Sequence, residues 1–303
     1  MRNVPDMSAE APLRYRCRHA TRYEYEQPVV GSHLVAHLAP RPRAGQTGRL
    51  TRLVIEPQPA VLIDRVDWFG NPVHYAAVEE PHGMLTVETE MEVEVRIAAP
   101  AHPGCTAPWE TIRAAATQTV ETADFLARSS RVDAARSLLA AYARSCFPDR
   151  VPVAVGCHDL MHRIHTDFAF DPQATTVSTP VAEVFANRRG VCQDFAHLMI
   201  GMLRSLGLPA RYVSGYIRTV PPGTGAWRGA ESSHAWVQAW CGEADGWLDL
   251  DPTNAVAIGT DHLTVAWGRD YDDVSPLRGV ILGGGRHLLH VGVQVDRVDS
   301  PTG

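Results

Sequence analysis

The feature that most constrains the fold is a change in the spacing of apolar residues along the chain. Over residues 13–98, apolar and polar residues alternate in short runs that proline and glycine interrupt, as in residues 91–95. This period of two is typical of strands with one buried face. From Pro108 to about Ser145, the chain is rich in alanine, leucine and arginine, which favours helices. We therefore expect a flexible tail over residues 1–12, an antiparallel β-domain over 13–100 and a helical connector over 101–150.

The second half of the chain predicts helices followed by strands. A helix is expected over residues 153–166, and another begins near Gly190 and ends before Gly207. In that second helix, apolar residues recur at three- and four-residue intervals, as one buried face requires. The period then returns to two over residues 210–218, 234–241 and 247–251. The sequence thus predicts an α+β protein whose residues 151–303 form a core with a helix packed on an antiparallel sheet.

Length, charge and cysteine content exclude several classes of protein. The 303 residues suggest about two domains. The chain has no apolar run near the ~18 residues of a membrane span, and its first dozen residues lack the apolar segment of a secretory signal. A net charge of −6 argues against a nucleic-acid binder. Six scattered cysteines without CxxC pairs favour reduced thiols, so we expect a cytoplasmic protein without membrane or nucleic-acid partners.

Cys192 stands at the predicted start of the apolar helix, directly after Arg188, Arg189, Gly190 and Val191. The unpaired N–H groups of a helix N-terminus favour a thiolate over a thiol. The two arginines add positive potential, and the glycine leaves room for a substrate. Cysteine is also a common core residue, but this position favours a reactive nucleophile.

His234 differs from the other histidines because it begins a predicted strand whose neighbour carries carboxylates. A thiolate nucleophile needs a partner that accepts and returns a proton near neutral pH, which histidine does. If residues 242–243 formed a tight turn, His234 would face Asp251 across the two strands. In the same pairing, Trp236 would face Asp249.

Either aspartate could fix the imidazole tautomer and stabilise the imidazolium. We select Asp251, because Pro252 ends the strand there and leaves the carboxylate at a rim. Asp249 is the alternative, because Asp245 and Gly246 could widen the turn and change the register.

Three segments together resemble the core of transglutaminase-like enzymes, a superfamily with papain-like Cys-His-Asp chemistry and bacterial members described as cysteine proteases. They are residues 189–195 (RGVCQDF), 232–236 (SSHAW) and 246–253 (GWLDLDPT). Residues 13–100 resemble the N-terminal β-region of the bacterial members through residues 23–25, 28–29, 40–42, 45–46 and 68–71. Further similarity lies in residues 178–180, 190–199, 210–216, 251–254, 268–271, 276–280 and 283–285.

The resemblance implies that Cys192 is the nucleophile, His234 the general acid/base and Asp251 its orienting partner, without a cofactor. It implies acyl transfer from an amide of a protein or peptide, through a thioester, to water or a primary amine. Gln193 and Tyr216 are candidates for lining the site, and Trp236 falls near it. All 28 basic residues are arginine, so the chain offers no lysine amine of its own as an acceptor.

Two other functions fit parts of the sequence. His158, His162 and His165 recur along one face of a predicted helix, as in a zinc hydrolase, but no glutamate occupies the usual general-base position. A non-catalytic binding module on the same fold is the other alternative. In that case the N-terminal β-domain would recognise a protein partner.

Overall fold

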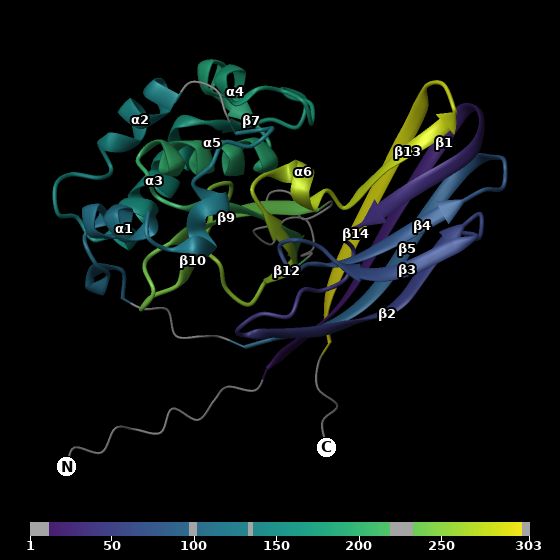
Figure 1. The fold of residues 1–303 in the computed structure, drawn as a ribbon, viewed down its shortest axis with the longest axis horizontal. Coiled ribbons are helices and arrows are strands. Elements are labelled where there is room, and N and C mark those ends of the chain that lie inside the picture. Colours follow the sequence, from purple (N-terminus) through teal and green to yellow (C-terminus); the bar gives the residue numbers. More distant parts are fainter. Residues whose placement is uncertain (1–11, 97–101, 133–135, 219–232, 299–303) are drawn as a thin grey trace, which may run out of the picture.

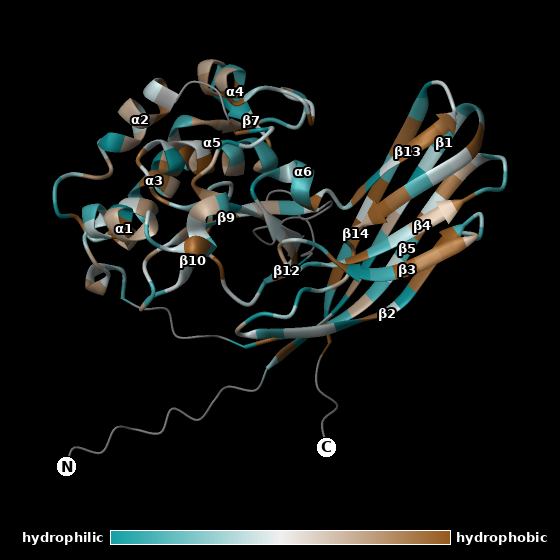
Figure 2. Cartoon of the chain, in the orientation of Figure 1, coloured by the Kyte–Doolittle hydropathy of each residue, from teal (hydrophilic) through white to brown (hydrophobic). Residues whose placement is uncertain are grey.

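The long strand β1 (Leu13–Ala36) organises the first of two lobes in the computed structural model, which describes residues 12–96, 102–132, 136–218 and 233–298 (Figure 1). Within these residues, β1 lies at the centre of a seven-stranded sheet with the order β2-β5-β1-β4-β3. Its buried and exposed residues alternate, as predicted, and hydrophobic and hydrophilic segments alternate along the strands (Figure 2). The other strands of this order are β2 (Gln46–Glu56), β3 (Val61–Val66), β4 (Pro72–Val78) and β5 (His82–Val95).

The last two strands of the chain return to this first lobe. Both β13 (Leu277–Gly283) and β14 (His287–Val298) pair antiparallel with β1. The expected core over residues 151–303 is therefore too long at its C-terminal end. The alternation in these strands predicts a strand but does not say which sheet it joins, since pairing depends on tertiary contacts.

The second lobe holds the helices and a smaller sheet. Its helices are α1 (Trp109–Ala116), α2 (Arg136–Arg144), α3 (Val153–Asp167), α4 (Val181–Asn187), α5 (Cys192–Ser205) and α6 (Tyr271–Val274), with 3₁₀ turns at Pro103–Cys105 and Val120–Phe125. α3, α5 and the three strands that follow them form where the sequence predicts them. None of the helices in the described residues is long and apolar enough to span a membrane.

The helical stretch expected from Pro108 to Ser145 is broken into separate pieces. α1 ends at Ala116, and the chain then runs through a 3₁₀ turn before α2. The hydroxyl of Thr117 donates to the carbonyl of Ala114, and that of Thr119 donates to Ala115. Such side-chain bonds to nearby carbonyls compete with continuation of the helix.

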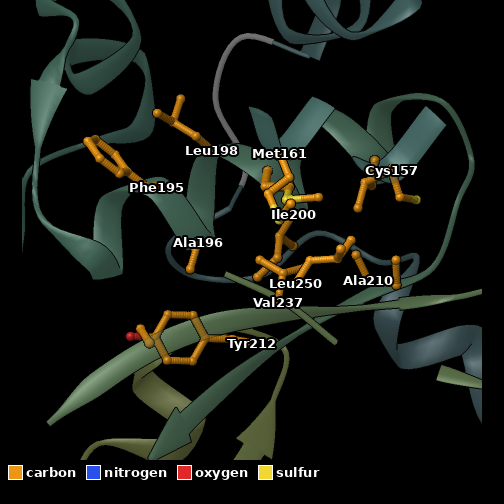
Figure 3. Close-up of a cluster of buried hydrophobic side chains, with 14 of the residues drawn as sticks. Cys157, Met161, Phe195, Ala196, Leu198, Ile200, Ala210, Tyr212, Val237 and Leu250 are labelled. Atoms are coloured by element: carbon orange, nitrogen blue, oxygen red, sulfur yellow. The ribbon is translucent and has the colours of Figure 1, made fainter. Parts of the chain in front are cut away.

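Helix α5 forms the centre of the second lobe. It packs against a five-stranded antiparallel sheet with the order β11-β10-β9-β8-β12, and apolar residues of the helix and the strands meet in one core (Figure 3). The strands are β8 (Ala210–Ile217), β9 (His234–Trp240), β10 (Trp247–Asp251), β11 (Val256–Ala257) and β12 (His262–Gly268); two short strands, β6 (Ala169–Phe170) and β7 (Arg189–Gly190), pair separately. This packing fixes both ends of α5 relative to the sheet.

The two lobes share apolar and polar contacts along a seam. Tyr15 and Cys17 of β1 belong to the same buried cluster as the residues around α5. The amide of Gln46 donates to the carbonyl of Thr264 at 2.7 Å and accepts from the N–H of Thr264 at 2.8 Å. Gln46 therefore binds β12 much as a neighbouring strand would.

Candidate active site

Cys192 is the first residue of α5, and its side chain is partly exposed. The carboxylate of Asp194 accepts from the N–H of Val191 at 2.8 Å and from the hydroxyl of Thr175 at 2.6 Å. A Cβ at Gly190 would lie 2.6 Å from that same carboxylate oxygen, so this close approach needs a glycine. The chain therefore enters α5 in one fixed path, which holds the sulfur at the positive end of the helix.

The two arginines before Cys192 have partners of their own. Arg189 forms an ion pair with Asp171 at 3.4 Å. The guanidinium of Arg188 lies over the ring of Phe185, 4.3 Å from its centre. The positive potential expected from these residues is thus shared with groups other than the sulfur.

The imidazole of His234 lies between Asp251 and Cys192. His234 begins β9 and Asp251 ends β10, and Nε2 of the histidine is 2.9 Å from Oδ2 of the aspartate. Both side chains are buried. The other ring nitrogen, Nδ1, is buried and has no partner at hydrogen-bond distance among the described residues, and Cys192 interacts with the ring. The structure thus brings the three predicted residues together.

Burial and the neighbouring charges shift the pKa of His234 in opposite directions, and the same is true of the pKa of Asp251. Burial lowers the pKa of His234, but the negative charges of Asp251 and Cys192 outweigh it and raise that pKa to about 10. Burial raises the pKa of Asp251, yet its bonds with His234 and His262 bring that pKa well below its usual range. The arrangement therefore favours an imidazolium next to an ionised carboxylate.

A pH titration of the His234 imidazole by NMR tests this charge balance. Because its pKa is raised from 6.5 to about 10, the charged ring should persist through neutral pH. Its contribution to folding stability is then fully present below pH 6.5 and lost as the pH rises through about 10. A midpoint between pH 6 and 7, the ordinary range of histidine, would contradict the ion pair.

The strands that carry these residues pair in a different register from the one expected. Leu250 lies opposite Val237, and Trp247 lies opposite Trp240. The prediction of a tight turn at residues 242–243 is wrong. The connection between the strands also includes Asp245 and Gly246, and it closes through a hydrogen bond from the N–H of Gly246 to the carbonyl of Gly242. His234 consequently reaches Asp251 diagonally rather than from the position directly opposite.

Asp251 is held on all sides by hydrogen-bond donors. Its oxygens accept from the N–H of Thr253 at 2.8 Å and from the N–H and side-chain amide of Asn254 at 3.2 and 2.7 Å. Nε2 of His262, on β12, lies 3.3 Å from the same oxygen that bonds His234. The sequence did not indicate His262, because nothing in its local pattern separates it from the other histidines.

Asp249, the alternative orienting residue, faces the N-terminal lobe. Its carboxylate binds the guanidinium of Arg43 at 2.6 and 3.2 Å and accepts from Nε1 of Trp236 at 3.0 Å. The geometry therefore supports Asp251, and not Asp249, as the partner of His234.

The three residues expected to line the site have different surroundings. Gln193 is partly exposed, and its amide donates to the carbonyl of Val177 at 3.2 Å. Tyr216 is buried, and its hydroxyl bonds to Nδ1 of His19 in the N-terminal lobe at 2.7 Å. Trp236 is fully buried beside His234. Of the three, only Gln193 has a partly exposed side chain.

The expected zinc face of α3 does not form a common site. Nδ1 of His165 bonds to the carbonyl of Thr253 at 2.9 Å, and His158 and His162 do not join it in any group of donor atoms close enough to hold an ion, as far as the described residues show. Within the described residues, the donor atoms of His234, Asp251 and His262 are the ones that lie together, within 4.8 Å of one another. The hydrogen bonds on Asp251 described above join the members of this set.

Comparisons with known proteins show the family to which the chain belongs. One family model, the bacterial transglutaminase-like N-terminal region, matches residues 15–94. Another, the transglutaminase-like superfamily, matches residues 155–252, which include Cys192, His234 and Asp251. An uncharacterized protein of Mycobacterium tuberculosis is 39% identical over 293 residues, or 91% of each chain. The chain belongs to the transglutaminase-like superfamily.

Two further relatives of this transglutaminase-like protein carry more specific names. A protein-glutamine gamma-glutamyltransferase of Pseudomonas aeruginosa is 38% identical over 97 residues, which are 31% of this chain and 14% of that protein. The crystal structure of a candidate cysteine protease from Cytophaga hutchinsonii superposes with a TM-score of 0.73 at 18% identity, over 97% of this chain and 93% of that one. The second comparison shows that the two-lobed fold recurs in that protein.

Proposed function

We propose that this transglutaminase-like protein cleaves an amide by thiol-dependent acyl transfer, with Cys192 as nucleophile, His234 as general acid/base and Asp251 as the orienting partner. The single observation that carries the proposal is the placement of the His234 imidazole between the Asp251 carboxylate and the Cys192 thiol. A sulfur at a helix N-terminus beside an imidazolium is suited to exist as a thiolate, which is the nucleophilic form.

The first half of the reaction forms a thioester. The sulfur of Cys192 attacks the amide carbonyl carbon, and the carbonyl oxygen takes up the negative charge. The N–H of Cys192, in the first turn of α5, has no carbonyl partner within the helix and is a natural donor to that oxygen. The imidazolium of His234 then gives its proton to the departing nitrogen, and the C–N bond breaks.

The second half returns the enzyme to its starting state. Water or a primary amine attacks the thioester carbon, and His234 removes the proton of this acceptor while the C–S bond breaks. Asp251 supports both halves, because its bond to Nε2 keeps Nδ1 directed to the reacting atoms. The acceptor determines whether the protein acts as a hydrolase or as a transglutaminase.

Substrate and surroundings follow from the same chemistry. We propose a glutamine carboxamide or a peptide bond of a protein or peptide as the donor, with a primary amine as an optional acceptor. The mechanism needs no cofactor. All six cysteines are free thiols, and a cytoplasmic location without nucleic-acid or membrane partners stays a prediction.

The test is incubation with a library of glutamine-containing peptides, with and without a primary amine, followed by mass spectrometry. Deamidation, backbone cleavage and amine incorporation produce different masses, so the three outcomes are separable. Products that form equally with a Cys192→Ala variant, or only after a metal ion is added, would contradict the proposal. The second result would favour the metal hydrolase, and specific peptide binding without any product would favour the binding module.

A further inference from the structure

Arg43 of the N-terminal lobe reaches across the seam between the lobes to β10 and β12. The two terminal nitrogens of Arg43 bind the two carboxylate oxygens of Asp249 at 2.6 and 3.2 Å. One of these nitrogens also donates to the hydroxyl of Thr264 at 3.1 Å. Only 23% of the Arg43 side chain and 10% of the Asp249 side chain are exposed. Such a bidentate, mostly buried ion pair fixes the orientation of the Asp249 carboxylate and also balances its charge.

Asp249, which Arg43 keeps in place, in turn positions the indole of Trp236. The carboxylate accepts from Nε1 of Trp236 at 3.0 Å, and the indole has no exposed surface. Its ring lies nearly parallel to that of His234, with 6.2 Å between centres and 28° between planes. A Cβ at Gly215, the residue opposite His234 on β8, would lie 2.4 Å from the indole. The indole is therefore packed closely against β8, next to the imidazole.

The hydrogen bond between Asp249 and Trp236 can break if Arg43 is replaced. Asp249 would then lose the cation that is hydrogen-bonded to it, and only the charge of Arg211, which acts on Asp249 without a bond between them in the described residues, would offset the cost of its burial. A cavity of about 300 Å³ lies at this point of the seam, lined by Arg43, Asp249, His262 and Thr264 among others. It offers room into which the carboxylate could turn, away from the indole.

We propose that Arg43 is a positioning residue for the reaction: it holds Asp249, and through Asp249 the Trp236 indole, against the imidazole of His234. The inference rests on the proposed function, since it assumes that His234 serves Cys192. It makes the N-terminal lobe a structural part of the active site and not only a surface for recognition.

The test measures how fast iodoacetamide alkylates Cys192 at pH 7, by peptide mass spectrometry. Cys105, which is exposed in the 3₁₀ turn, provides a reference rate in the same molecule. Arg43→Met, Asp249→Ala and Trp236→Phe each break one link. Each variant should lower the alkylation rate of Cys192, relative to that of Cys105, by about tenfold. This is a typical effect of groups that orient a reactive side chain. The double variant Arg43→Met/Asp249→Ala should be no slower than either single variant, because both changes break the same chain of contacts.

Two further variants separate positioning from general stability. Arg43→Lys keeps the charge but not the bidentate bond. Its relative alkylation rate at Cys192 should therefore lie between those of Arg43→Met and the wild type. Arg41→Gln alters another arginine of the seam, which stacks on Trp267 and donates to Asn71 and Phe69. It should lower the melting temperature and leave the ratio of the two alkylation rates unchanged. Equal losses in Arg41→Gln and Arg43→Met, no loss in Arg43→Met, or losses that multiply in the double variant would each overturn the proposal.

The same readout distinguishes this inference from the proposed function, because alkylation needs no substrate. If a His234→Ala change leaves the alkylation rate of Cys192 unaltered, the proposed function fails and the inference fails with it. If the seam variants follow the expected pattern but no amide is turned over, the positioning role stands and the substrate class is wrong. On an active peptide, Arg43→Met should lower kcat about tenfold and leave KM within about twofold.

Discussion

A Cys192→Ala variant is expected to lose turnover by a factor on the order of 10⁴ or more while keeping its fold. The sulfur is the only atom that this change removes, and it is the atom proposed to form the thioester. Because the Cys192 side chain is partly exposed, its loss leaves no large cavity. Peptide mass spectrometry for activity and thermal melting for stability provide the two measurements.

The matched control for this variant is Cys105→Ala, which removes an exposed thiol from a 3₁₀ turn in the same lobe. It should retain wild-type activity and stability. Undiminished turnover in Cys192→Ala, or an equal loss in Cys105→Ala, would show that Cys192 is not the nucleophile.

An Asp251→Asn variant is expected to lower kcat by about 10³ to 10⁴, the size of effect that follows when the imidazole takes the wrong tautomer. Among the described residues, Asp251 accepts hydrogen bonds from His234, His262, Thr253 and Asn254, which are all donors to it. An amide at this position turns its NH₂ group toward some of these donors, which drives His234 to reorient its proton. The variant should also lose about 1–3 kcal/mol of unfolding free energy, because a buried donor is left without an acceptor.

Asp249→Asn is the comparison for that variant, since it keeps an oxygen that can accept from Trp236 and lies two residues away. It should lower kcat about tenfold or less. The pH profiles should differ as well. Removing the charge of Asp251 removes a main cause of the raised pKa of His234, so the alkaline limb should move below pH 10 in Asp251→Asn. A larger kcat loss in Asp249→Asn would make Asp249 the orienting residue.

Local patterns predicted much of the fold and the main elements of the site. The three- and four-residue spacing around Phe195 defines α5, and the alternation over residues 91–95 defines part of β5. Cys192 at the start of one predicted helix and His234 at the start of one predicted strand could be identified because both follow from element boundaries. Such boundaries depend on neighbouring residues, which a sequence displays directly.

The features that escaped prediction depend on contacts between distant segments. The register of β9 and β10 depends on a turn that Gly246 closes, and a change of register moves every side chain relative to its partner. His262 approaches Asp251 only because β12 pairs with β8. Arg43 lies between residues that carry the family resemblance, but no local pattern distinguishes it, and the role proposed for it depends on the contact between the two lobes.

Arg14 at the beginning of β1 pairs with Val298 of β14, the last described residue. Synthesis on the ribosome therefore exposes one side of β1 until β13 and β14 have emerged, although N-terminal domains usually fold first. The helical lobe is translated in between and is available to pack against β1 before β13 and β14 arrive. Nascent chains that stop short of β13 would consequently present an open strand edge, which is a hazard for aggregation.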